Sequence, residues 1–169
     1  PQSSQELRMK TLKFIAACVL LTSANHVFSH ENASHDSHAA PAPQQQAWGI
    51  AGQAREATRT ITLRMTDDMR FTPAQFKARV GETVRLRVEN KGKVLHEVVL
   101  GTQASLAEHA AMMREHPGMA HSEAHMAHVA PGGAQDLVWR FNRAGSFDFA
   151  CLVAGHYEAG MRGTFTVTP

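Results

Sequence analysis

The sequence predicts an all-β protein, a Greek-key β-sandwich or barrel, and three observations support this fold class. Short segments with alternating apolar and polar residues recur from residue 60 to residue 167, and Gly and Asn turns separate them. No helices alternate with these segments in the way that builds a parallel α/β sheet. With 169 residues, 43% hydrophobic and 19% charged, the chain suits one globular domain of ordinary size.

Six strands follow from this alternation, because side chains along a strand point in turn to opposite faces of the sheet. A turn at Gly81 precedes the second strand, and residues 90–93 form the turn before the third. The inward-facing residues, in chain order, are Ile61, Leu63 and Met65; Val84, Leu86 and Val88; Val94, His96, Val98 and Leu100; Leu137, Trp139 and Phe141; Phe147, Phe149, Cys151 and Val153; and Phe165 and Val167. We expect these six faces to pack into one core.

One insertion, residues 102–130, interrupts the pattern between the third and fourth strands. It is predicted to begin with a helix, because the Ser105 side chain can cap the free amides of a first turn while Glu108 returns the bond. Pro117 and Gly118 are predicted to end that helix. The domain at residues 48–169 is therefore expected to carry a partly helical insertion.

Two segments precede this domain. Residues 1–29 contain a charged start and a short apolar run typical of a signal peptide, which we expect to start at Met9 and to be cleaved before His30. The residues around Cys18 resemble a lipobox, so a lipoprotein is the alternative. Both interpretations predict an exported, periplasmic protein, and the apolar run is too short to span a bilayer. Residues 30–47 contain almost nothing large and apolar and are predicted to form a flexible, His-rich arm.

Charge and composition exclude one class of partner and indicate another. The chain has 17 Lys and Arg against 15 Asp and Glu; three of the basic residues and one acidic residue lie in the first 29, which leaves 14 of each sign. A neutral body of this kind does not suit a protein that binds nucleic acid through charge. In contrast, 11 His and 8 Met accompany a single Tyr. Such an excess of imidazole and thioether indicates binding of a soft metal.

The most specific motif is Cys151-x4-His156-x4-Met161, together with His96 on the third expected strand. A thiolate and two imidazoles with a weak axial thioether form a blue-copper site, because sulfur stabilises Cu(I) and imidazole accepts Cu(II). Cys151 ends one strand and Met161 begins the next, so one tight loop can fold three of the residues round one ion. Singly, each has an ordinary explanation, such as a small buried hydrophobe or a core filler. Their combination favours copper.

Hydrolytic chemistry finds little support in the sequence. It contains no G-x-S-x-G turn, no phosphate-binding glycine loop and no H-E-x-x-H pair. Cys151 as a nucleophile with His156 as its base would leave Met161 and His96 without a role.

Residues from about 58 to 169 resemble the cupredoxin family of type 1 (blue) copper proteins, the fold of plastocyanin, azurin and rusticyanin. The segment FDFACLVAGHYEAGM at 147–161 is similar to the copper loop of that family. The resemblance implies a cupredoxin-like Greek-key fold and one type 1 copper bound by His96, Cys151, His156 and Met161. The chain departs from azurin and plastocyanin at Glu97, where those proteins have an Asn that ties the two copper-bearing segments together. The His-rich arm, WGIAG at 48–52 and the insertion resemble periplasmic copper-tolerance cupredoxins of the CopI type.

The insertion and the arm contain further candidate copper ligands. Those of the insertion start at helical spacing and are His109, Met112, Met113, His116, Met119, His121, His125, Met126 and His128. Such a set suits Cu(I) or Ag(I); the alternative is that the methionine stripe packs in the core with Leu106 and Ala110. The arm contributes His30, His35 and His38. If cleavage leaves His30 first, its amine and imidazole can chelate Cu(II) together; otherwise the arm only raises the local copper concentration.

Three functions fit these observations. The excess of ligands favours a periplasmic copper-tolerance protein that binds or redox-cycles one copper and captures more ions in its clusters. The alternative is a soluble blue-copper electron-transfer protein whose insertion docks a redox partner. A cuprous oxidase is disfavoured, because multicopper enzymes use His-x-His pairs and this sequence has none. The expected partners are copper ions and a periplasmic redox or copper-transfer protein, with no nucleic acid and no membrane span.

Overall fold

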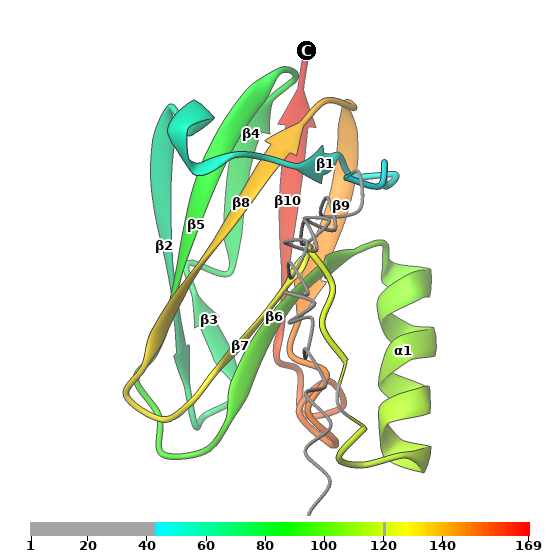
Figure 1. Ribbon diagram of the computed structural model, residues 1–169. Helices are drawn as coiled ribbons and strands as arrows, with labels where there is room; N and C mark the ends of the chain where they lie inside the picture. Colours follow the sequence, from blue (N-terminus) through cyan, green and yellow to red (C-terminus); the bar gives the residue numbers. More distant parts are fainter. Residues whose placement is uncertain (1–42, 120) are drawn as a thin grey trace, which may run out of the picture. The chain divides into compact units, whose positions relative to one another are not determined.

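The computed structural model describes residues 43–119 and 121–169. These residues form two five-stranded sheets, with one helix beside the second sheet (Figure 1). The predictions for residues 1–29, and for His30, His35 and His38, lie outside the described residues. Within the described ranges no helix has the length and apolar character needed to cross a membrane.

Each sheet combines segments that are far apart in the chain. The first sheet has the order β1 (Ile50–Ala51), β8 (Ala134–Phe141), β5 (Glu82–Asn90), β2 (Arg59–Thr66) and β3 (Arg70–Thr72). The second has the order β4 (Gln75–Arg79), β10 (Arg162–Thr168), β9 (Gly145–Ala150), β6 (His96–Gly101) and β7 (Met126–Val129). β2 runs parallel to β5, and β10 runs parallel to β4; the other pairs are antiparallel. The predicted all-β sandwich is confirmed.

The core lies between the two sheets, where the period-two alternation places it. Leu63 and Met65 of β2 are fully buried, whereas Arg64 between them is exposed. The same alternation buries the inward faces of β5, β8 and β10. Four large aromatic residues fill this core at 1% exposure or less: Trp139, Phe141, Phe149 and Phe165. This packing fixes the positions of the start of β6 and the end of β9, where His96 and Cys151 lie.

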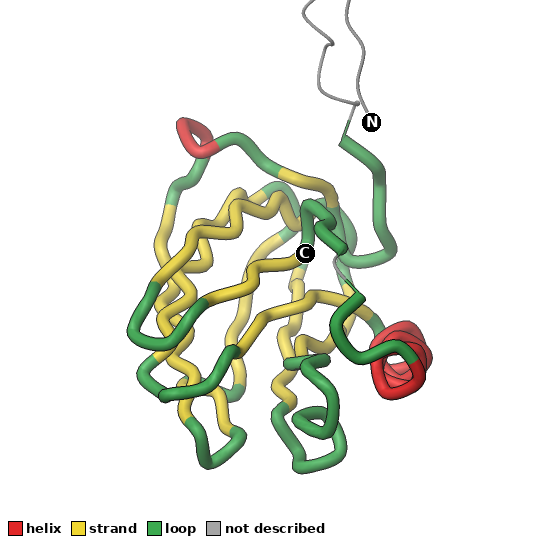
Figure 2. The backbone as a smooth tube through the Cα atoms, turned by 60° about the horizontal axis from the view of Figure 1, so that its bottom comes forward, coloured by secondary structure: helices red, strands yellow, loops and turns green. Residues whose placement is uncertain are grey.

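β6 is an exception to simple alternation, because all six of its residues are buried. Its outer side packs against α1 (Gln103–Glu115), where Val99 shares a second apolar cluster with the helix residues Leu106, Ala110 and Met113. Figure 2 shows this helix outside the sandwich. The methionine stripe predicted as copper-binding therefore contributes at least Met113 to the packing of the helix.

The sequence analysis missed four short strands, β1, β3, β4 and β7, because an alternation over only two to five residues is too short to be recognised. β7 has the largest consequence, since it places residues 126–129 in the sheet instead of in a loop of the insertion. Two predicted strands were too long. Val94 is 43% exposed in the loop before β6, and β9 ends at Ala150, before Cys151 and Val153.

The predicted cap of the helix was also wrong. Thr102 is the N-cap: its hydroxyl accepts a hydrogen bond from the Ser105 N–H (3.1 Å), and the Ser105 hydroxyl accepts one from the Thr102 N–H (3.0 Å). Ser105 thus serves as the third residue of a capping box, a position that sequence spacing had assigned to Glu108. The helix ends at Glu115, two residues before Pro117, as predicted.

Gln45, which lies within the segment predicted as an arm, contacts the sandwich. The Gln45 side-chain amide donates to the Gly49 carbonyl (2.9 Å) and to Asn142 Oδ1 (3.0 Å). Trp48 is buried, and its carbonyl accepts a hydrogen bond from the Trp139 indole (3.1 Å). The segment before β1 is therefore fastened across the first sheet.

Candidate metal centre

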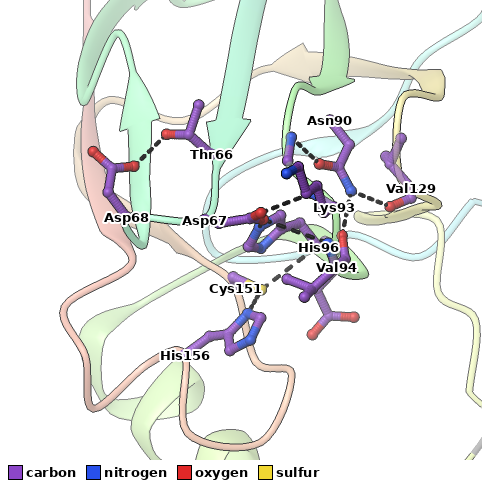
Figure 3. Close-up of polar contacts among 12 residues, drawn as sticks. Thr66, Asp67, Asp68, Asn90, Lys93, Val94, His96, Val129, Cys151 and His156 are labelled. Atoms are coloured by element: carbon purple, nitrogen blue, oxygen red, sulfur yellow. Dashed lines mark hydrogen bonds and ion pairs between the residues drawn. The ribbon is translucent and has the colours of Figure 1, made fainter.

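Three of the four predicted type 1 ligands meet at one end of the sandwich. His96 is the first residue of β6, Cys151 follows the last residue of β9, and His156 lies in the loop before β10. One ligand atom from each lies within 4.8 Å of the others. Cys151 Sγ is 3.3 Å from His156 Nδ1 (Figure 3). His96 and Cys151 are fully buried, so His156 is the member of this group that remains partly open to solvent.

The fourth predicted ligand, Met161, is held beside Cys151 by the backbone of the loop between β9 and β10. The Met161 carbonyl accepts a hydrogen bond from the Cys151 N–H (3.1 Å), and the Met161 N–H donates to the His156 carbonyl (3.0 Å). Gly155 and Gly160 adopt positive φ values of 86° and 91°, which a residue with a Cβ adopts only with strain. The Met161 side chain is fully buried in the same apolar cluster as Cys151.

A carboxylate that the sequence analysis did not identify fixes the orientation of His96. Asp67 Oδ1 lies 3.1 Å from His96 Nε2, and the same carboxylate accepts hydrogen bonds from the N–H groups of Lys93 (2.8 Å) and Val94 (3.4 Å). The Lys93 N–H is the main reason why the pKa of Asp67 lies below its usual value. Gly92 allows this close approach, because a Cβ there would lie 1.9 Å from Asp67 Oδ1.

These residues fit a copper ion. His96 Nδ1 is buried and has no hydrogen-bond partner within residues 43–119 and 121–169, while Nε2 lies beside the Asp67 carboxylate. A metal-binding histidine normally has this arrangement, with one nitrogen bound to a carboxylate and the other free for the ion. Two imidazoles, a thiolate and a thioether form the mixed donor set that suits copper in both oxidation states.

Burial sets the protonation of the free site. Burial raises the pKa of the Cys151 thiol from 9.0 to about 12, although the Glu97 N–H donates to its sulfur (3.4 Å). Burial also lowers the pKa of His156, which keeps this imidazole in the neutral, metal-binding form. A protonated and fully buried thiol is a poor nucleophile, so the geometry argues against a Cys151–His156 hydrolytic pair.

Glu97 ties together the two segments that carry the ligands. Its side chain is 1% exposed, and Oε1 accepts a hydrogen bond from the Leu152 N–H (2.9 Å). The second oxygen, Oε2, lies 2.6 Å from His128 Nε2. Burial raises the pKa of Glu97, and the neighbouring His128 opposes that rise. The Glu97 carboxylate therefore joins the segments that carry His96 and Cys151, as the Asn does in azurin and plastocyanin. It also contacts His128 on β7.

The structure brings together only some of the accessory ligands predicted in the insertion. His109 Nε2 of α1 lies 2.9 Å from His121 Nε2, and the rings of His121 and His128 have centroids 5.5 Å apart. The His125 ring instead packs edge-on against Trp48, with centroids 5.4 Å apart. Two methionines pack in or against the apolar cluster beneath the helix, and the other candidates are exposed. The packed residues are Met113 and Met126, and the exposed ones are Met112, His116 and Met119.

Comparison with known proteins places the chain among copper proteins. The family model of the copper-binding proteins of the plastocyanin/azurin family matches residues 57–168. The chain is 43% identical over 151 residues to the copper-resistant cuproprotein CopI of Rubrivivax gelatinosus. This alignment covers 89% of this chain and 92% of that protein. It is 37% identical over 153 residues to CopI of Pseudomonas aeruginosa, over 73% of this chain and 84% of that protein.

Solved structures share the fold at lower identity. The reduced auracyanin of Roseiflexus castenholzii superposes with a TM-score of 0.58 at 20% identity, over 67% of this chain and 99% of that one. Auracyanin B superposes with a TM-score of 0.60 at 22% identity, over 77% of this chain and all of that one.

Proposed function

Because the chain belongs to the plastocyanin/azurin family of copper-binding proteins and is a relative of the CopI cuproproteins, we propose that it acts in copper resistance by binding one type 1 copper. Copper is the cofactor of this family. We assign His96, Cys151, His156 and Met161 as the ligands. The observation that supports this assignment is the cluster of two imidazoles and a thiol, in which the buried His96 Nδ1 has no hydrogen-bond partner among the described residues.

Copper bound there would supply one-electron redox chemistry, and the proposal includes redox cycling of the ion. The surrounding residues would hold the ligands in place whichever oxidation state is bound. Asp67 orients His96, and the Glu97 N–H donates to the sulfur of Cys151. Because these supports belong to strands and short loops of a packed sandwich, the ligands have little freedom to rearrange when the charge of the ion changes.

We further propose that the protein works in the periplasm, exported by the leader at residues 1–29. The insertion and the His-rich arm would capture additional copper there. The number of imidazole and thioether groups beyond the four type 1 ligands motivates this part of the proposal. In the insertion, Met112, His116 and Met119 are exposed, so they can meet copper ions in solution.

An optical titration of the copper-free protein with Cu(II) tests the ligand assignment. We expect an intense visible band from thiolate-to-copper charge transfer that saturates at one equivalent of copper. Cys151→Ala should abolish the band, whereas Cys18→Ala in the uncleaved chain, which removes the other cysteine, should retain it. A wild-type protein that is folded by circular dichroism and develops no band would overturn the type 1 assignment.

Growth of a strain that lacks the gene separates copper resistance from the alternative of electron transfer. With a plasmid encoding Cys151→Ala, we expect sensitivity to high copper and normal respiration at low copper. A dedicated electron-transfer protein predicts the reverse, namely slowed respiration and unchanged growth in high copper, and that result would contradict the proposal. Point variants are preferable to deletion of the insertion, because α1 buries Leu106 and Ala110 against the second sheet.

A further inference from the structure

A second group of metal-binding side chains lies next to the type 1 centre, on the face of β6 opposite to His96. Glu97, His121 and His128 each offer one ligand atom, and these three atoms lie within 4.8 Å of one another. Glu97 and His128 are direct cross-strand partners in the β6–β7 pair, so the ladder itself holds the carboxylate against the imidazole. His121 comes from the segment before β7, which brings its ring beside that of His128.

Hydrogen bonds prepare the ring of His121 for a metal ion. Its Nδ1 lies 3.0 Å from the carbonyl oxygen of Met119, which can only accept, so Nδ1 carries the proton. Nε2 is then the nitrogen of this ring that carries a lone pair. Metal-binding histidines are commonly fixed by a backbone carbonyl in this way. His109 Nε2 lies 2.9 Å from that Nε2, so α1 brings a third imidazole within reach of the same position.

The buried carboxylate supplies the second reason to expect a cation. Glu97 is 1% exposed, and its one ion-pair partner among the described residues is His128. A buried carboxylate is costly unless a positive charge accompanies it, and a cation bound beside Glu97 would supply that charge. A cavity of about 440 Å³ lies in front of the carboxylate, lined among others by His121, His128, Met113 and Met119. The exposed side chain of Met119 places this cavity at the protein surface, where an ion can enter.

We propose that Glu97, His121 and His128 bind a second copper as Cu(II), with His109 as a further imidazole ligand. Oxygen and imidazole donors suit Cu(II) and Zn(II), and of these two Cu(II) binds more tightly at a given site. The site therefore differs from the Cu(I) cluster predicted from the sequence in its membership and in the oxidation state that it selects. This inference deepens the proposed role in copper resistance, but it rests on residues outside the type 1 ligand set.

The two sites share Glu97 as a common element. Its N–H donates to Cys151 Sγ (3.4 Å), and its Oε1 accepts from the N–H of Leu152, the residue after that cysteine. A cation bound to this carboxylate adds positive charge close to the type 1 site, which disfavours Cu(II) there relative to Cu(I). We therefore expect occupancy of the second site to raise the reduction potential of the type 1 copper and to shift its visible band.

Electron paramagnetic resonance during a Cu(II) titration of the full chain tests the proposal. After the type 1 site is filled, the next equivalent should give a second signal with the larger copper hyperfine splitting of a nitrogen and oxygen site, and with nitrogen splitting from imidazoles. His121→Ala and His128→Ala should each weaken this binding by more than about 100-fold, beyond the 10–100-fold loss typical of an outer-shell partner. Glu115→Gln, at the exposed last residue of α1, is the control and should leave it unchanged.

Each outcome of this experiment bears on one of the two sites. The visible type 1 band in the same samples shows that each variant is folded and tests the proposed function separately from the second site. An unchanged second signal in both His121→Ala and His128→Ala would overturn the inference. A measurement that needs no variant is the NMR spectrum of the copper-loaded wild type with one equivalent of Zn(II). Imidazole resonances of His121 and His128 that do not move would also overturn it.

Discussion

Treating the copper-free protein with a thiol-alkylating reagent at several pH values measures how strongly the fold holds the proton on Cys151. Alkylating reagents attack the thiolate and not the thiol. The pKa of this thiol is raised from 9.0 to about 12 because the side chain is buried. At pH 8 a thiol with a pKa of 9.0 is about one-tenth ionised, and one with a pKa of 12 is about one ten-thousandth ionised. We therefore expect alkylation of Cys151 to be roughly a thousand times slower than that of the same cysteine in the denatured chain.

The same shift has a consequence for stability. A thiol whose pKa is higher in the folded state favours folding below the unfolded pKa, and that contribution is lost as pH rises through the folded pKa. The copper-free protein should therefore lose up to about 4 kcal/mol of unfolding free energy between pH 9 and pH 12. Copper bound by Cys151 as proposed should reverse this pH dependence, because it would bind the thiolate and release the proton. Apparent copper affinity should rise about tenfold per pH unit near neutral pH.

Mass spectrometry of peptides after iodoacetamide treatment separates Cys151 from Cys18 and gives a rate for each. The rate at Cys151 should rise tenfold per pH unit from pH 8 to pH 11, and one equivalent of copper should stop the reaction. The protein in guanidinium chloride is the control for the accessible thiol. A folded, copper-free protein that reacts at the denatured rate, or whose rate levels off near pH 9, would refute the reasoning that burial holds the proton.

Other predictions concern the supports of the site. Asp67→Asn should weaken copper binding by about 10–100-fold, measured by competition with a chelator. Asp68→Asn is the control, because the Asp68 carboxylate pairs with a threonine hydroxyl instead. Equal copper affinities in the two variants would contradict the role of Asp67. Gly92→Ala should reproduce the loss, because the new Cβ would displace the Asp67 carboxylate; wild-type affinity would show that the loop adjusts freely. Leu106→Ala should lower the unfolding free energy by about 2–5 kcal/mol in denaturant titrations. It should leave the visible copper band unchanged, because Leu106 packs in the apolar cluster between α1 and the second sheet. Loss of the band would show that this cluster and the copper site are coupled.

Much of the sandwich could be predicted, because long strands with one buried face carry their own signal. The β2, β5, β8 and β10 strands are each seven to nine residues long and bury alternate residues on one face, and each was recognised. The Cys151–Met161 loop could also be predicted, because three candidate ligands lie close together in the chain. β1, β3, β4 and β7 could not, because their pairing depends on strands elsewhere in the chain and each has only two to five residues, too few for an alternation to stand out.

The parts of the site that could not be predicted depend on contacts between distant residues. Asp67 lies 29 residues before His96, and nothing in its local sequence indicates that its carboxylate reaches that ring. Helical spacing grouped His109 with Met112 and Met113, yet the fold directs His109 to His121 and buries Met113. Glu97 was recognised only as a departure from the family. Its contact with the histidine of β7 follows from the register of two strands, one of which was not expected.

The distribution of the proposed type 1 ligands along the chain affects the order of metal loading and folding. Cys151, His156 and Met161 lie in one short loop, and only His96 comes from a distant strand. An unfolded chain therefore already has three of the four donors close together and can bind copper before the sandwich forms. Because an ion that also binds the unfolded chain stabilises the fold by less than its full affinity, the net stabilisation by copper should reflect mainly the addition of His96. Newly made chains that meet copper before they fold would then carry the ion into the finished site.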